Sequence, residues 1–203
     1  MRYWRDDYFK TLRDITADAT KWPEWADYAD FCLEYERGLR PQAFTTLERF
    51  IRALEGAPFP ERRRFVSWLM TTSDGTRGQH MAVPHPLRLR IVEPTLVEWT
   101  AVEPKCPEPH RWLGGYEHLK SALELDETDE VARRKLVVCI LGSVGYSTHE
   151  RPSGYVGNPQ QDLASLVEAE GLLQGLPNED ERRQWASEIQ EERVLIQQYL
   201  RKE

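Results

Sequence analysis

The feature that most constrains the fold is the regular spacing of large apolar residues between Pro23 and Gly56. One set follows Pro23 at steps of three and four, namely Trp25, Tyr28, Cys32, Tyr35 and Leu39. A second set follows Pro41 at the same kind of spacing: Phe44, Leu47, Ile51 and Leu54. This spacing places one apolar stripe along each of two helices, and proline suits the first turn of a helix. The short connection between the two predicts an antiparallel helical hairpin.

The same periodicity recurs along the chain, so we expect an all-α fold. Further helices are predicted over residues 3–20, 109–125, 129–145 and 163–175, from Pro60 onward, and after Asn178. Two segments are compatible with either a helix or a strand. In residues 87–92 apolar residues alternate with arginine, and residues 136–141 are apolar on every side. We favour helix in the first because a lone strand would have no sheet to join, with a kink or restart at Pro94. We favour a helix buried between its neighbours in the second.

One stretch interrupts this pattern and suggests a division of the chain. Residues 73–86 contain glycines and prolines and have no helical period. We therefore expect a loop there, with helical subdomains over 1–75 and 86–203 that pack into one continuous unit.

The stretch from Glu108 to Leu141 has the pattern of a helix, a short acidic turn and a second helix capped by Asp129. Within it, Gly115, Leu119 and Ala122 precede the sequence Leu123–Glu124–Leu125–Asp126. This segment resembles about one repeat's length of the tetratricopeptide repeat (TPR) family. The resemblance implies stacked antiparallel helical hairpins, as a TPR-like solenoid or an irregular helical bundle, and it implies partner binding and not catalysis. The helix after Asn178 resembles the capping helix that such arrays need.

Charge is distributed unevenly. Residues 1–100 contain 15 Lys/Arg and 15 Asp/Glu, whereas residues 101–203 contain 12 and 19, so the whole net charge of −7 lies in the second half. An acidic surface attracts basic proteins and repels nucleic acid. We therefore predict a protein partner with a basic surface and no nucleic-acid binding. The predicted binding residues combine acidic groups that guide the partner with aromatic and arginine anchors: Arg111, Trp112, Glu124, Asp126, Glu127, Asp129, Glu130 and Tyr155.

Composition also bears on location. No stretch approaches the length of a membrane span, and the acidic residues among positions 1–20 do not fit a signal peptide. The three cysteines are odd in number and far apart, as expected for reduced thiols. These features predict a cytoplasmic protein without membrane contact.

Two further hypotheses stay open. The acidic half fits an immunity-type protein that neutralises a cationic toxin or enzyme. A small metalloprotein or metalloenzyme would use His80, His85, Cys106 and His110, since four such ligands can surround zinc if their loops meet. No catalytic motif is present, because Gly142–Ser143–Val144–Gly145 lacks the G-x-S-x-G spacing of a nucleophile elbow. We therefore predict neither catalysis nor a cofactor.

Overall fold

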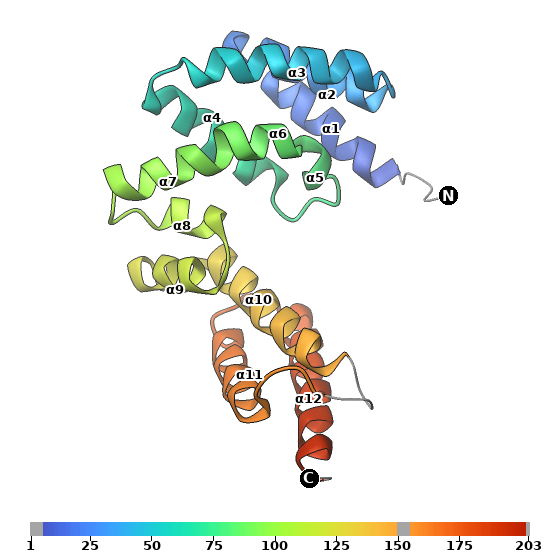
Figure 1. Cartoon of the computed structure of the whole chain (residues 1–203), viewed down its shortest axis with the longest axis vertical. Coiled ribbons are helices and arrows are strands. Elements are labelled where there is room, and N and C mark those ends of the chain that lie inside the picture. The colour runs from blue at the N-terminus through green and yellow to red at the C-terminus, as the bar shows by residue number, and fades with distance from the viewer. Residues whose placement is uncertain (1–5, 150–154, 202–203) are drawn as a thin grey trace. The chain divides into compact units, whose positions relative to one another are not determined.

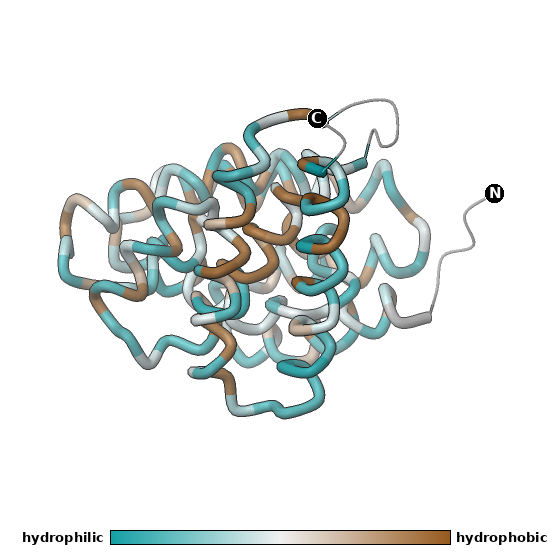
Figure 2. Tube along the Cα trace, turned by 90° about the horizontal axis from the view of Figure 1, so that it is seen from below, coloured by the Kyte–Doolittle hydropathy of each residue, from teal (hydrophilic) through white to brown (hydrophobic). Residues whose placement is uncertain are grey.

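The structure is a computed structural model that describes residues 6–149 and 155–201. Every regular element in these ranges is a helix, which confirms the predicted all-α class (Figure 1). Figure 2 shows hydrophobic and hydrophilic residues alternating along the helices, as expected when each helix buries one side. None of the described helices is long and apolar enough to cross a membrane.

The chain divides into two compact units, Met1–Pro104 and Lys105–Glu203. The division therefore lies after Pro104, and the loop expected over 73–86 is inside unit 1. Unit 1 contains the helices α1 (Asp6–Ala19), η1 (Pro23–Trp25), α2 (Ala26–Glu36), α3 (Arg40–Glu55), α4 (Phe59–Ser73), α5 (Gln79–Ala82), α6 (His85–Leu87), η2 (Arg88–Val92) and α7 (Glu93–Val102). Unit 2 contains α8 (Pro107–Leu113), α9 (Tyr116–Leu125), α10 (Glu130–Thr148), α11 (Pro159–Leu173) and α12 (Glu179–Leu200).

Aromatic rings form the centre of unit 1. The Phe65 ring lies 4.9 Å from that of Phe50, 5.1 Å from that of Tyr28 and 5.5 Å from that of Trp25, all between centroids. These four side chains are buried, as the sequence spacing of Trp25 and Tyr28 predicts. The Tyr28 hydroxyl donates a 2.7 Å hydrogen bond to the carbonyl of Ala82, which satisfies the one polar atom that the ring takes into the core.

The segment 73–86 packs against α1 more closely than a loop boundary suggests. A Cβ at Gly78 would lie 2.6 Å from the carbonyl oxygen of Tyr8 and 2.6 Å from the Cβ of Thr11. Glycine therefore permits a backbone approach that any side chain would obstruct. This close approach holds α5 inside unit 1.

Residues 87–92 are helical, so the helix favoured from the sequence is confirmed. Arg88–Val92 forms a π-helical turn that continues directly into α7. Pro94 has no N–H to donate to the carbonyl of Arg90, and its ring crowds that carbonyl in a regular α-helix. A wider turn immediately before Pro94 accommodates the proline without ending the helix.

Unit 2 has an aliphatic core. Consecutive helices from α8 to α12 pack against one another, and α12 also packs against α10 (Figure 1). The core residues on α10 are Ala132, Leu136, Val137, Ile140 and Val144. The array of packed neighbours agrees with the all-α class, and its resemblance to TPR repeats stays a prediction.

The continuous helix expected over 109–125 is wrong, because it forms two helices. Gly114 has φ 69° and ψ −167°, and Gly115 has φ 74° and ψ 159°. These dihedral angles lie in a region of the Ramachandran map that is essentially restricted to glycine, and they end α8 and start α9.

The predicted helix starts are confirmed at two positions. Asp129 accepts a 2.9 Å hydrogen bond from the backbone N–H of Ala132, and Asn178 accepts from Asp180 and Glu181 at 3.0 and 3.1 Å. Residues 136–141 are helical within α10, as favoured. Helix α10 extends to Thr148, so the loop expected over 146–159 is shorter, and its residues 150–154 lie outside the described ranges.

Candidate functional site

The predicted acidic segment is a tight turn between α9 and α10, and we call residues 124–130 the acidic turn. Asp126 closes it by accepting hydrogen bonds from the backbone N–H of Thr128 at 2.9 Å and from its hydroxyl at 2.7 Å. The hydrogen bond from the Thr128 side chain, followed by that from its backbone, lowers the pKa of Asp126 below its ordinary value. The carboxylate is therefore ionised throughout the physiological pH range.

Asp129 has the capping role that the sequence predicts, and it is not one of the exposed acidic groups of the turn. Its carboxylate is buried, caps α10 through Ala132 and accepts a 2.6 Å hydrogen bond from Nε of Arg111. Since both oxygens are engaged inside unit 2, Asp129 and Arg111 hold α8 against the start of α10. They stabilise the turn from inside unit 2.

The remaining acidic residues of the turn face solvent. Glu124, Glu127 and Glu130 are exposed, and no hydrogen bond or ion pair among residues 6–149 and 155–201 engages their carboxylates. Leu125 lies between them in sequence and is 39% exposed. The turn thus presents an apolar side chain next to unpaired negative charge. Sequence reasoning missed Leu125 because its helical position fitted the core.

Trp112 is not an exposed anchor. It is only 7% exposed, and its ring has the Arg111 guanidinium 5.5 Å and the Lys135 ammonium 4.9 Å from its centroid. Cations at these distances over an indole are stabilised by the ring's electrons. The tryptophan therefore packs α8 onto α10 within unit 2.

Tyr155, the second predicted anchor, is half-buried at the start of the segment that leads into α11. Its hydroxyl donates a 2.6 Å hydrogen bond to Asp162, and its ring centroid lies 5.1 Å from that of Tyr199. A shallow hollow of about 310 Å³ is lined by Tyr155, Gly157, Asn158, Pro159, Gln160 and Tyr199. Tyr155 is thus held in place and partly accessible, but the structure does not bring it into the acidic turn.

The four proposed metal ligands are divided between the two units, with His80 and His85 in unit 1 and Cys106 and His110 in unit 2. Within the described part of the chain, no group of three or more His, Cys, Asp or Glu side chains is arranged to hold a metal ion. His80 packs edge-on against Tyr8, with 5.4 Å between ring centroids. His110 lies beside His118, with 3.2 Å between their Nδ1 atoms. Burial, followed by the charge of His118, lowers the pKa of His110.

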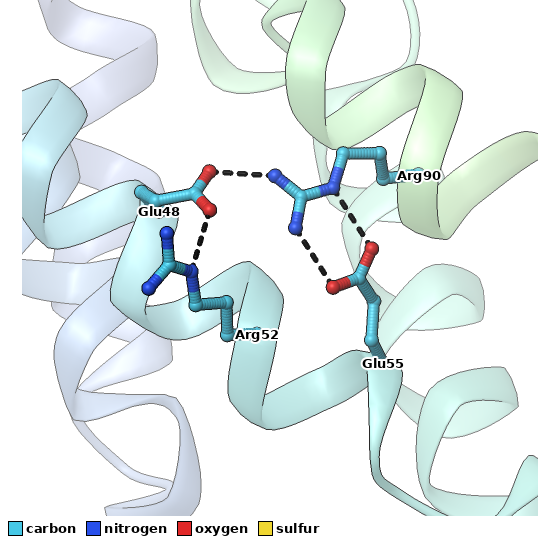
Figure 3. Close-up of polar contacts among 4 residues, drawn as sticks. All are labelled: Glu48, Arg52, Glu55 and Arg90. Atoms are coloured by element: carbon cyan, nitrogen blue, oxygen red, sulfur yellow. Dashed lines mark hydrogen bonds and ion pairs between the residues drawn. The ribbon is translucent and has the colours of Figure 1, made fainter.

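The surface of unit 1 shows how carboxylates behave when they are paired. Arg90 donates two hydrogen bonds to Glu55, at 2.7 and 2.8 Å, and one to Glu48 at 2.6 Å, while Arg52 donates to Glu48 at 2.8 Å (Figure 3). The bonds to Glu55 and then to Glu48 raise the pKa of Arg90, and those from Arg52 and then Arg90 lower the pKa of Glu48. This network connects α3 to η2, and its positive and negative side chains pair with one another.

A broad hollow of about 570 Å³ lies next to this network on α3. It is lined by Pro41, Phe44, Thr45, Glu48, Arg49 and Arg52. Phe44 is 37% exposed there, although its spacing predicts a core position. Arg49 is already bound to both carboxylate oxygens of Asp27, at 2.6 and 2.7 Å, so this surface is less available to a charged partner than the acidic turn.

Comparison of the chain with protein-family models, with curated proteins and with solved structures gave no match.

Proposed function

We propose that this chain is a protein-interaction module that binds a protein with a basic surface through the acidic turn. The observation that supports the proposal is the group of exposed carboxylates at Glu124, Glu127 and Glu130, which no described residue neutralises. Asp126 adds a fourth negative charge beside them. Complementary potentials accelerate encounter and exclude partners of the wrong charge.

The turn is also fixed in shape, which suits it to recognition. Asp126 is bound to Thr128, and Asp129 is bound to Ala132 and Arg111. A partner that binds this turn does not have to order it first, so little binding energy is lost to ordering. Leu125 provides the apolar contact that charge alone does not supply.

Glu124 and Glu127 are the residues whose removal tests the proposal with least structural damage. Glu130 lies in the first turn of α10, where the positive end of the helix favours an acidic side chain. Glu124 and Glu127 have no such role. A control with the same change of charge exists in unit 1, where Asp30 and Glu61 are also exposed and without an ion pair among the described residues. Glu61 lies in the first turn of α4, so the folding of this variant is checked by thermal unfolding.

The experiment uses the full chain as bait in a lysate of its source cells, followed by kinetics with the purified partner. We expect Glu124→Gln with Glu127→Gln to slow association about three- to tenfold and to flatten its salt dependence, since steering acts on the association rate. Asp30→Asn with Glu61→Gln removes the same amount of charge and should leave the rate nearly unchanged. Equal effects of the two double variants would contradict the proposal.

A further inference from the structure

His110 and His118 form a close pair in unit 2 that the sequence spacing does not reveal. His110 lies on α8 and His118 on α9, and their Nδ1 atoms are 3.2 Å apart. The ring centroids are separated by 5.4 Å, and the ring planes are inclined by 42°. His118 is exposed and His110 is half-buried, so the pair is accessible to solvent.

The glycine break between α8 and α9 creates this pair. In a continuous helix, residues eight positions apart are separated by about 12 Å along the axis. The positive φ angles of Gly114 and Gly115 instead turn the chain, and α9 packs against α8. Two imidazoles that a single helix would hold apart therefore meet at hydrogen-bond distance.

The separation of the two nitrogens matches that of two ligands on one metal ion. Zinc–nitrogen bonds are about 2.0–2.1 Å long, which places two nitrogens of a tetrahedral site about 3.3 Å apart. For ligands at right angles, as in the tetragonal sites of copper or nickel, the same bond lengths give about 2.9 Å. The observed separation of 3.2 Å falls between these two values.

The hydrogen bond that joins the rings is the alternative to a bound ion. A neutral imidazole carries its hydrogen on one ring nitrogen, so one Nδ1 donates and the other accepts. When the donor ring carries its hydrogen on Nε2 instead, both Nδ1 lone pairs are available to a cation. This change moves a hydrogen within one neutral ring, so no proton is gained or lost. The exposed His118 ring can turn by the small angle that aims both lone pairs at one ion.

We propose that His110 and His118 bind a divalent transition-metal ion, Zn²⁺ or Cu²⁺, through their two Nδ1 atoms. Imidazole suits zinc, copper and nickel, whereas calcium and magnesium prefer oxygen ligands. The net charge of −7 carried by residues 101–203 raises the local concentration of cations. The proposal concerns α8 and α9 and does not depend on a partner at the acidic turn.

The site has two protein ligands, and this determines its expected behaviour. No third His, Cys, Asp or Glu side chain among the described residues completes it. Structural zinc sites are closed by four protein ligands, so an ion held by two keeps positions for water. We therefore expect reversible binding that is weaker than in a structural zinc site, and tighter for Cu²⁺ than for Zn²⁺.

The test is calorimetric titration of the full chain with Zn²⁺ at pH 7.5, where histidine is mostly neutral. The wild-type chain is compared with His110→Gln and with His118→Gln. The matched control His85→Gln removes an exposed histidine of unit 1. A second control, Cys106→Ser, removes the thiol that lies four residues before His110.

We expect one ion per chain, and each variant of the pair should weaken binding at least about tenfold. Even the loss of an outer partner of a metal ligand costs about 10–100-fold in affinity. His85→Gln and Cys106→Ser should keep the wild-type affinity. Saturating Zn²⁺ should also raise the melting temperature of the wild-type chain and of both controls, but not that of the two pair variants.

A measurement on the wild-type chain makes the outcome independent of how the variants fold. The NMR signals of the His110 and His118 rings should shift together as Zn²⁺ is added, while that of His85 should not. Absence of saturable binding up to millimolar Zn²⁺ would overturn the proposal. Binding that His85→Gln or Cys106→Ser removes, or that His118→Gln leaves intact, would overturn it as well.

Discussion

Both units pair many of their described carboxylates with basic side chains, but they differ at the acidic turn of unit 2. In unit 1, arginines on neighbouring helices form ion pairs with many of the described carboxylates, including Asp27, Glu36, Glu48, Glu55, Glu93 and Glu98. In unit 2, the carboxylates of Glu124, Glu127 and Glu130 in the acidic turn take part in no hydrogen bond or ion pair among the described residues. A fold of this size is thus able to pair its acidic groups, and unit 2 leaves several unpaired in one place.

The cores of the two units differ in composition. Unit 1 buries a cluster of aromatic rings around Phe65, whereas the core of unit 2 is mainly aliphatic. Both units leave some apolar side chains exposed, such as Phe44 in unit 1 and Leu125 in unit 2. The difference between the units therefore lies in the packing of their cores and in the unpaired carboxylates of the acidic turn.

The largest expected effect tests the aromatic core. Phe65→Ala removes a fully buried ring in contact with Trp25, Tyr28, Phe50 and Trp68, and it should lower the free energy of unfolding by about 3–5 kcal/mol. Urea denaturation followed by tryptophan fluorescence measures the loss, because Trp25 and Trp68 lie beside the ring. A loss below about 1 kcal/mol would show that the cluster does not stabilise unit 1.

The next effect tests the break between α8 and α9. Gly114→Ala forces a side chain into a region of the Ramachandran map that only glycine adopts readily, at a cost of about 1–3 kcal/mol. Gly171→Ala, in the open interior of α11, should instead stabilise the chain by about 0.5–1 kcal/mol. Thermal unfolding of the two variants should therefore shift in opposite directions, and equal shifts would contradict the assigned turn.

A smaller effect concerns pH. The pKa of His110 is lowered in the folded chain by burial and then by the charge of His118, so the unfolded chain binds protons more readily there. Stability from this group is complete above the ordinary histidine pKa of about 6.5 and is lost as the pH falls through that range. His118→Ala should raise the pKa of His110 toward its ordinary value, as NMR titration of His110 can show. An unchanged pKa in that variant would exclude His118 as a cause.

The smallest effect concerns the network in Figure 3. Arg90→Ala leaves Glu48 and Glu55 without their shared partner, and the loss of stability should be slight and decrease with added salt, since these groups are exposed. Glu124→Gln in the acidic turn has no pair to break and should leave the melting temperature unchanged. A larger loss of stability from Glu124→Gln than from Arg90→Ala would contradict the view that the Glu124 carboxylate is unpaired while those of Glu48 and Glu55 are paired.

Much of the fold is predictable from sequence periodicity. The stripes after Pro23 and Pro41, the caps at Asp129 and Asn178 and the helix across Pro94 are all present. The break at Gly114–Gly115 was missed because the apolar residues keep helical spacing on both sides of it. The positive φ angles of the two glycines leave no trace in that spacing. The close approach at Gly78 depends on a distant contact with α1, which local pattern does not reveal.

The site is less predictable because exposure depends on tertiary packing. Trp112 and Arg111 have the composition of a binding hot spot, yet they fill the contact between α8 and α10. Val138 belongs to an apolar run whose periodicity has no polar side, so sequence alone cannot tell which of its residues face solvent. The uneven distribution of charge between the two halves of the chain is evident in the sequence, and it predicted the acidic residues of the turn as binding residues.

The most direct test of the central claim is zero-length carbodiimide coupling of the captured partner to this chain, with the joined residues mapped by mass spectrometry. The reagent links carboxylates to lysine amines that are in contact. We predict that partner lysines couple to Glu124, Glu127 or Glu130, and that excess salt suppresses the coupling. Coupling confined to carboxylates of unit 1, such as Asp30 or Glu61, would contradict the proposal that the acidic turn binds the partner.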